Sequence, residues 1–214
     1  TGRVAIILYS LLLASGATQT RFAPGFREKS PLVGDIDIAI GAFTTSHLGY
    51  SFNKQCEVMR RELSLFPLDR ENNYLDEIST PELRVHCGDI DPEKLAMWMN
   101  SGQPFLHIAT PQADLAQIGP LVIPGQSPCL RCLELSERDQ SGVINTLQLR
   151  HDTGVDYPVI AAYYIAALAA SQILGYCEKQ SSEITGKVIS LDYQALAHPQ
   201  VLTIARHPLC GCAF

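Results

Sequence analysis

The chain carries little charge, and the charge it carries is not basic. Only 18% of its 214 residues are charged, and 16 lysines and arginines stand against 22 aspartates and glutamates, which gives a net charge of −6. A nucleic-acid-binding protein would show a basic face, so this balance argues against nucleic acid as a partner. Internal repeats and low-complexity tracts are also absent, so neither a repeat architecture nor a disordered tract is expected.

Hydrophobic residues make up 46% of the sequence, which is enough to bury a sizeable core. Strands and helices are predicted to alternate, which indicates an α/β fold with a mainly parallel sheet flanked by helices. The predicted strands are 18–22, 36–42, 83–87, 105–109 and 119–123, and the predicted helices are 49–65 and 92–100. Asp91 is the expected N-cap of the second helix, and 187–192 with 201–205 is the expected antiparallel pair.

Two apolar segments resemble targeting or membrane sequences. Residues 3–17 have one positive charge, an apolar run and small residues, as a signal peptide does. We interpret them instead as a buried strand over 3–8 and a helix over 9–15 with Gly16 as its C-cap. Residues 158–176 are uncharged and about long enough to span a bilayer. They are expected to form a helix buried in a soluble protein, so no membrane partner is predicted.

Four of the seven cysteines stand in two tight pairs, Cys129 with Cys132 and Cys210 with Cys212. Each pair can grip one ion from a turn, and two such pairs far apart in sequence complete the four-sulfur shell of a tetrahedral zinc site. Gly211 allows the second turn to be tight. We therefore predict a structural Zn²⁺ that ties the C-terminal segment to the middle of the chain.

Two alternatives remain open for this set of cysteines. Disulfides could join the same pairs, or His207 could replace one of the sulfur ligands. Arg131, between the first two cysteines, would offset the negative charge of four thiolates on Zn²⁺. The other three cysteines stand alone, as buried thiols in a reducing compartment do, which indicates a cytoplasmic protein: Cys56, Cys87 and Cys177.

The order of motifs around the cysteines resembles a known superfamily. The segment 118–125 (IGPLVIPG) precedes the first cysteine pair, an alanine-rich helix follows it, and 207–212 (HPLCGC) ends the series. This order is similar to that of the ThiF/MoeB/HesA superfamily, relatives of the ubiquitin-activating enzymes. The branch most resembled is the actinobacterial one linked to thiazole/oxazole-modified peptide biosynthesis. The resemblance is specific over 104–214 and looser over 2–103.

The resemblance implies a single ThiF-like domain over residues 1–214. Its Rossmann-like part would be 1–125, and 126–214 would hold the zinc site, the alanine-rich helix and the C-terminal strands. The resemblance also implies a homodimer and chemistry with Mg-ATP. Family members adenylate the C-terminal carboxylate of a small protein or peptide.

The sequence departs from the family at the expected nucleotide site. The family's first strand leads into a glycine-rich turn that approaches the phosphates. Here no glycine lies between Gly2 and Gly16, and bulky side chains occupy the expected turn at Leu8 and Tyr9. We therefore expect a degenerate ATP site.

Asp89 is the one catalytic candidate. It follows a predicted strand, at the position where the resemblance implies an aspartate that orients magnesium and ATP, and a carboxylate there can hold Mg²⁺. The alternative is that Asp89 and Asp91 are turn and cap residues at the start of a helix.

The sequence thus predicts a degenerate activating-enzyme-like protein that binds a peptide or small-protein partner without adenylating it. The first alternative is a working ATP-dependent adenylating enzyme that acts on the C-terminus of a small protein or peptide. The second alternative is a secreted disulfide protein, which the signal-like N-terminal segment would favour.

Overall fold

The computed structural model describes residues 3–17, 20, 83–111, 115–141, 157–179, 181–193 and 198–212. They fall into two compact units, one formed by Thr1–Thr80 with Tyr157–Glu178 and the other by Pro81–Asp156 with Lys179–Phe214. Helices α1 and α6 belong to the first unit, and a five-stranded sheet with helices α4 and α5 belongs to the second. The elements predicted at 36–42 and 49–65, and all of 18–22 except Thr20, lie outside the described residues.

Helix α1 spans Arg3–Ala14, where the sequence predicted a strand over 3–8 before a short helix. That prediction was wrong because a short apolar run fits a buried helix as well as a buried strand. The buried side chains recur at helical spacing, as Val4 and Leu8 do. Gly16 follows the end of this helix as the predicted C-cap, since its φ of 90° suits the left-handed residue that comes after a helix.

Helix α6, Val159–Lys179, confirms the expected alanine-rich helix. Within the described residues it is the one helix long and apolar enough to cross a membrane, with a hydropathy of 1.5 and 44% of its apolar window buried. The core helix of a soluble protein can have the same length and hydropathy. The buried residues of α6 recur along one stripe, as they do on a helix packed against a globular unit. They are Ala161, Ala162, Ile165, Ala166, Ala169, Ala170, Ile173 and Tyr176.

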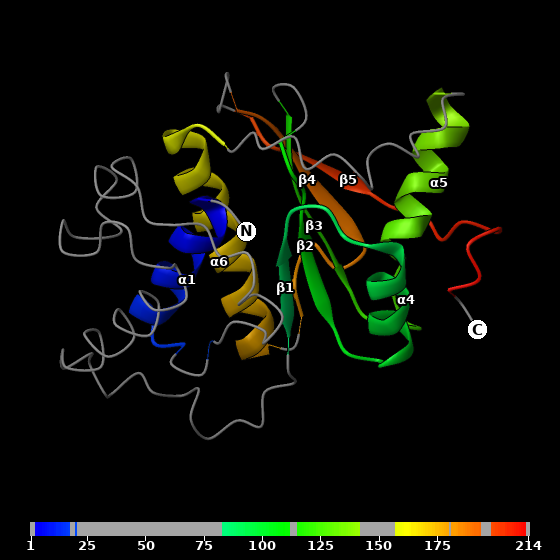
Figure 1. Ribbon diagram of the computed structural model, residues 1–214, viewed down its shortest axis with the longest axis horizontal. Helices are drawn as coiled ribbons and strands as arrows, with labels where there is room; N and C mark the ends of the chain where they lie inside the picture. Colours follow the sequence, from blue (N-terminus) through cyan, green and yellow to red (C-terminus); the bar gives the residue numbers. More distant parts are fainter. Residues whose placement is uncertain are drawn as a thin grey trace. The chain divides into compact units, whose positions relative to one another are not determined.

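The second unit is built on a sheet with the spatial order β1-β2-β3-β4-β5 (Figure 1). Strands β1 and β2 are parallel, and every other neighbouring pair is antiparallel. The strands are β1 Arg84–Cys87, β2 Phe105–Ile108, β3 Leu115–Val122, β4 Lys187–Asp192 and β5 Gln200–Thr203.

The sheet is therefore mixed, and the predicted mainly parallel sheet was wrong. Helix α4, Pro92–Asn100, makes the crossover that the parallel strands β1 and β2 require. The link from Ile108 to Leu115 is too short for another crossover, so β3 returns antiparallel to β2. The predicted antiparallel pair near the C-terminal end is confirmed by the register of β4 and β5.

The N-terminus of α4 has the predicted cap. The Asp91 side chain accepts a hydrogen bond of 2.8 Å from the N–H of Glu93, and Pro92 occupies the first helical position. This bond satisfies one of the amide groups that the first turn leaves without a helical partner. The helix cap is therefore Asp91 and not Asp89.

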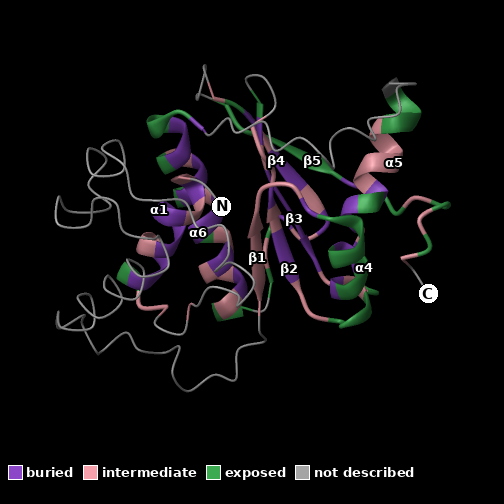
Figure 2. Ribbon diagram, in the orientation of Figure 1, coloured by how far each residue is buried: buried purple, intermediate pink, exposed green. Residues whose placement is uncertain are grey.

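Helices α4 and α5 (Leu130–Ser141) lie on the same side of the sheet in the second unit (Figure 2). The buried core beneath them contains Phe105, Val122 and Val188 from three different strands, together with Trp98 of α4. Cys129, Leu130 and Cys132 belong to the same buried cluster, and Cys210 and Cys212 pack against it. The two cysteine pairs thus lie at the edge of the hydrophobic core of this unit.

Gly119 in β3 provides a test of this sheet. Its φ is 102°, and a Cβ there would lie 2.6 Å from the backbone oxygen of Lys187 in β4. We expect Gly119→Ala to lower the free energy of unfolding by roughly 3 kcal/mol, because the methyl group adds a clash with backbone to the strain of a positive φ. Urea unfolding measures the change.

The control is Gly102→Ala. Gly102 also has a positive φ, 68°, but no atom lies within 4 Å of the added Cβ. We expect a loss of about 1 kcal/mol from backbone strain alone. Equal losses for the two variants would contradict the close approach of β3 and β4 at Gly119.

Candidate metal centre

The first cysteine pair lies at the start of α5. Cys129 precedes the helix, and its carbonyl oxygen accepts the N–H of Cys132 at 3.0 Å and that of Leu133 at 3.3 Å. This first turn brings the sulfur atoms of Cys129 and Cys132 to 4.0 Å from each other. The amide groups at a helix N-terminus carry partial positive charge, which favours thiolate over thiol.

The second pair lies on a tight turn after β5. The N–H of Cys210 donates to the carbonyl oxygen of His207 at 3.0 Å and closes this turn. Gly211, between the two cysteines, has a φ of 72°, as the sequence predicted for a tight turn. Cys210 and Cys212 are thereby presented to the start of α5.

The sulfur atoms of the two pairs converge. Cys129 Sγ lies 3.3 Å from Cys210 Sγ, and Cys132 Sγ lies 3.3 Å from Cys212 Sγ. All four sulfur atoms lie within 4.8 Å of one another, and the four side chains are free thiols. Four sulfur ligands of a tetrahedral zinc ion, each about 2.3 Å from it, stand about 3.8 Å apart. The four thiols can therefore bind one metal ion.

The sulfur atoms differ in their affinity for protons. Burial raises the pKa of Cys129 to about 11, and burial also raises the pKa of Cys210. Burial acts in the same direction on Cys132, but hydrogen bonds from the backbone of His207 and Cys129 and from the Cys212 thiol outweigh it, so its pKa is lowered to about 7. A cation bound among the sulfur atoms would displace the remaining protons.

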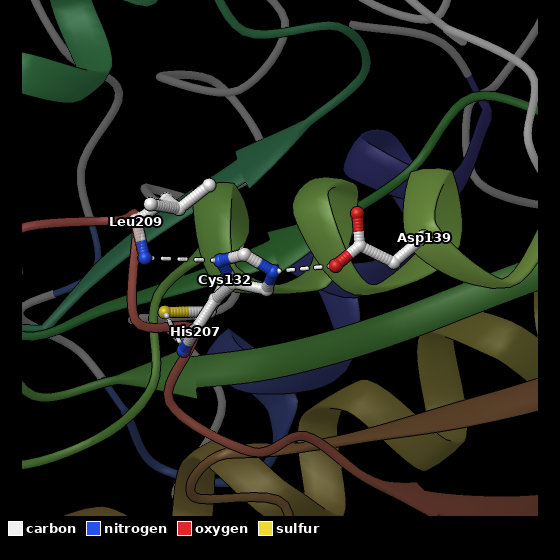
Figure 3. Close-up of polar contacts among 4 residues, drawn as sticks. All are labelled: Cys132, Asp139, His207 and Leu209. Atoms are coloured by element: carbon white, nitrogen blue, oxygen red, sulfur yellow. Dashed lines mark hydrogen bonds and ion pairs between the residues drawn. The ribbon is translucent and has the colours of Figure 1, made fainter.

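His207 lies beside Cys132 (Figure 3) and is not one of the four clustered ligand residues. Its backbone N–H donates to Cys132 Sγ at 3.4 Å. Its ring Nε2 lies 2.9 Å from Oδ2 of Asp139, on α5. The structure therefore gives His207 contacts to Cys132 and to Asp139 of α5, and gives no support to the alternative in which it replaces a sulfur ligand.

Arg131 was expected to offset the charge of the thiolates. The residue is exposed on the first turn of α5. Burial raises the pKa of Glu134, and the positive charge of Arg131 partly opposes this rise. A role for Arg131 at the sulfur atoms stays a prediction.

A cavity of about 60 Å³ with mixed polar and apolar lining lies beside α5 in the same unit. Burial raises the pKa of Glu134 and of Glu137, which both line it. The lining contains three carboxyl side chains and no lysine or arginine, so the cavity favours cations over anions. Its polar lining residues are Asp89, His107, Thr110, Gln117, Glu134 and Glu137.

Asp89 enters this cavity from the turn after β1. Its Oδ1 accepts a hydrogen bond of 2.6 Å from the hydroxyl of Thr110. Its Oδ2 is buried and has no hydrogen-bond partner among the described residues. The rings of His86 and His107 hold the turn, since each Nε2 donates to a backbone oxygen, that of Asp89 at 2.7 Å and that of Gly88 at 2.9 Å.

Sequence reasoning found Asp89 but missed the other polar residues of the cavity. Glu134 and Glu137 gave the one local signal, since residues three apart share a helix face. Thr110 reaches the cavity because the parallel strands β1 and β2 end side by side. Gln117 gave no signal, because it reaches the cavity only through the antiparallel return of β3 beside β2. That return was predicted as a parallel arrangement.

Comparison with known proteins links this fold to characterised structures. No family model matches the chain, and no curated protein matches it significantly. The fold is similar to that of E. coli MccB. One MccB structure aligns with 99% of this chain and 62% of its own, with a TM-score of 0.62 and 17% identity. MccB with AMPCPP and MccA aligns with 99% of this chain and 64% of its own, with a TM-score of 0.61 and 19% identity.

A heterocyclase in complex with substrate and cofactor aligns more partially. It matches 61% of this chain and 20% of its own, with a TM-score of 0.50 and 21% identity. The chain thus spans less than two thirds of the length of the MccB structures that it resembles. At these identities the likeness is one of fold alone.

Cys210→Ser tests the metal centre. We expect the variant to lose its bound metal and to unfold with a free energy lower by roughly 3 kcal/mol or more, because structural zinc binding contributes on the order of 10 kcal/mol to such sites. Metal analysis of the reduced protein and chemical unfolding measure the two effects. A chelator should destabilise the wild-type protein and leave the variant nearly unchanged.

The matched control is Cys177→Ser, which alters a half-buried cysteine of α6 in the other unit. We expect this variant to keep its metal. Full metal content and unchanged stability in Cys210→Ser would contradict a structural metal centre at these four residues.

His86 predicts a pH dependence of stability. Burial lowers its pKa from 6.5 to about 4, so between these values the unfolded chain binds a proton that the folded chain does not. The contribution of neutral His86 to the free energy of unfolding is therefore complete above pH 6.5, and it is lost as the pH falls toward 4. We expect His86→Gln, which keeps a donor for the Asp89 carbonyl, to flatten this part of the pH profile.

Urea unfolding of both proteins at several pH values between 7.5 and 4.5 measures the effect. Acid also protonates thiolates, so the quantity compared is the difference between variant and wild type at each pH. His198→Gln, at an exposed histidine, is the control and should follow the wild type. Parallel profiles for His86→Gln and wild type would show that His86 titrates normally in the folded protein.

Proposed function

We propose that the chain is a peptide-binding protein of the ThiF/MoeB/HesA class whose C-terminal segment is fastened by a structural zinc ion. The observation that carries this proposal is the likeness of fold over 99% of the chain to MccB in complex with AMPCPP and MccA. Several of the similar MccB structures hold the peptide MccA. This favours a peptide or small protein as the partner.

The chemistry of the donor set supports zinc in a structural role. Four thiolates are the ligands of closed tetrahedral zinc sites, which leave no position open for a substrate. Such an ion would add stability to the second unit and supply no reactive group. The residues that would hold it are Cys129, Cys132, Cys210 and Cys212.

Helix α1 removes one objection to nucleotide binding. A glycine-rich phosphate turn precedes its helix, whereas Leu8 and Tyr9 lie inside α1, so the lack of glycine there does not bear on the phosphates. The acidic cavity provides a different objection. Its three carboxyl groups, with no lysine or arginine beside them, would repel a triphosphate. We therefore keep peptide binding without adenylation as the primary function.

The second candidate is ATP-dependent adenylation of a peptide or small-protein C-terminus, and the specific observation in its favour is Asp89. Its buried Oδ2 has no hydrogen-bond partner among the described residues. A carboxylate with a free oxygen can hold Mg²⁺, and Mg²⁺ would offset the repulsion between the cavity and a triphosphate. In this case the substrate carboxylate would attack the α-phosphorus of ATP, with pyrophosphate as the leaving group.

The homodimer and the cytoplasmic location expected from the sequence also stay predictions.

Calorimetric titration distinguishes the two functions. We expect synthetic peptides from short reading frames beside the gene to bind without nucleotide, and we expect no saturable heat from Mg-ATP. Asp89→Asn and, as a control at an exposed carboxylate, Glu183→Gln should bind peptide as the wild type does. The adenylating enzyme would replace the primary proposal if the wild type binds Mg-ATP saturably, if Asp89→Asn lowers the affinity for Mg-ATP about tenfold or more, and if Glu183→Gln leaves it unchanged.

A further inference from the structure

His207 organises the turn that carries the second cysteine pair. Its carbonyl oxygen accepts the N–H of Cys210 at 3.0 Å. Its ring Nδ1 accepts the N–H of Leu209 at 3.2 Å (Figure 3). Pro208, the next residue, has a fixed φ that suits the second position of such a turn. The backbone and the side chain of one histidine thus shape the segment that presents Cys210 to α5.

The bond from Leu209 determines the tautomer of the ring. Nδ1 accepts a hydrogen bond and therefore holds a lone pair, so the ring proton lies on Nε2. Nε2 then donates to Oδ2 of Asp139 at 2.9 Å. The His207 side chain is only 10% exposed, whereas that of Asp139 is 63% exposed. An exposed carboxylate therefore fixes the orientation of a largely covered ring.

His207 is joined to α5 at two separate points. Cys132 and Asp139 are seven residues apart, which is about two helical turns, so they lie on one face of α5. The backbone N–H of His207 meets the sulfur of Cys132, and its ring meets the carboxylate of Asp139. A residue held at two points about 10 Å apart along a helix has little freedom to turn. The cysteine turn that follows it is therefore fixed relative to the first cysteine pair.

We propose that His207 and Asp139 form a positioning pair that holds Cys210 and Cys212 in register with Cys129 and Cys132 before the metal binds. The inference rests on the proposed metal centre and adds two residues to it that are not ligands. Partners of this kind commonly change metal affinity 10–100-fold, because they orient the ligands and reduce the ordering that binding requires.

The test is metal affinity measured by competition with a chelator, using Co²⁺ and Zn²⁺ as probes. We expect His207→Ala and Asp139→Ala each to weaken binding about 10–100-fold, with the thiolate-to-cobalt charge-transfer band retained. The double variant should bind no more weakly than the weaker single variant, because the two residues act through one contact. Full additivity would show that they act separately and would overturn the pairing.

Two conservative variants separate the contacts of the ring. The amide nitrogen of glutamine can replace Nε2, so His207→Gln keeps a donor for Asp139 and should recover most of the affinity. The amide oxygen of asparagine can replace Nδ1 alone, so His207→Asn should stay weak. Recovery by asparagine and not by glutamine would contradict the role of Asp139. Because Asp139 is exposed, its variants test the pair even if the His207 variants fail to fold.

The controls are His198→Ala and Gln140→Ala, at an exposed histidine and an exposed position of α5, which should bind metal as the wild type does. The wild type could bind metal through thiolates while all His207 and Asp139 variants bind it with the same affinity. That result would overturn the positioning pair and leave the metal centre intact. A reduced wild-type protein that binds no metal would overturn the metal centre, and the positioning pair with it.

Discussion

The convergence of four sulfur atoms is the constraint on which the second unit depends. It joins residues 80 and 81 positions apart in the chain, at sulfur–sulfur distances of 3.3 Å. Two of these cysteines lie in the hydrophobic core beneath α4 and α5, and the other two pack against it. Thiolates at such separations repel one another, which favours the protonated thiols, and a bound cation offsets this repulsion. A metal ion there would therefore connect the core of the sheet to the segment that follows β5.

The sheet places a second polar feature beside the same helix. Strands β1 and β2 are parallel, and the turn after β1 brings Asp89 into the cavity lined by Glu134 and Glu137 of α5. The helix that begins at the metal centre thus also forms one wall of the cavity. This arrangement links the two features physically, because a shift of α5 on loss of the metal would move two of the three carboxyl groups. A structural ion can in this way influence a site to which it is not bound.

The sequence was informative where the signal is local. The cysteine pairs, the Asp91 cap, the alanine-rich helix and the last antiparallel pair each follow from residues close together in the chain, and all of these elements are found. The apolar run at Arg3–Leu8 misled because strand and buried helix share that composition. Strand direction, the cavity lining and the contact between His207 and Asp139 depend on long-range packing, which a single sequence does not encode in any short pattern.

A single metal ion held by these four cysteines would explain why their sulfur atoms converge. X-ray absorption at the zinc edge, on protein purified and kept under reducing conditions, reports the ligand atoms themselves. The structure predicts a first shell of four sulfur atoms at about 2.3 Å, with no nitrogen or oxygen ligand. A shell dominated by nitrogen and oxygen would contradict it, as would protein that contains no metal and has its four sulfur atoms joined in disulfides.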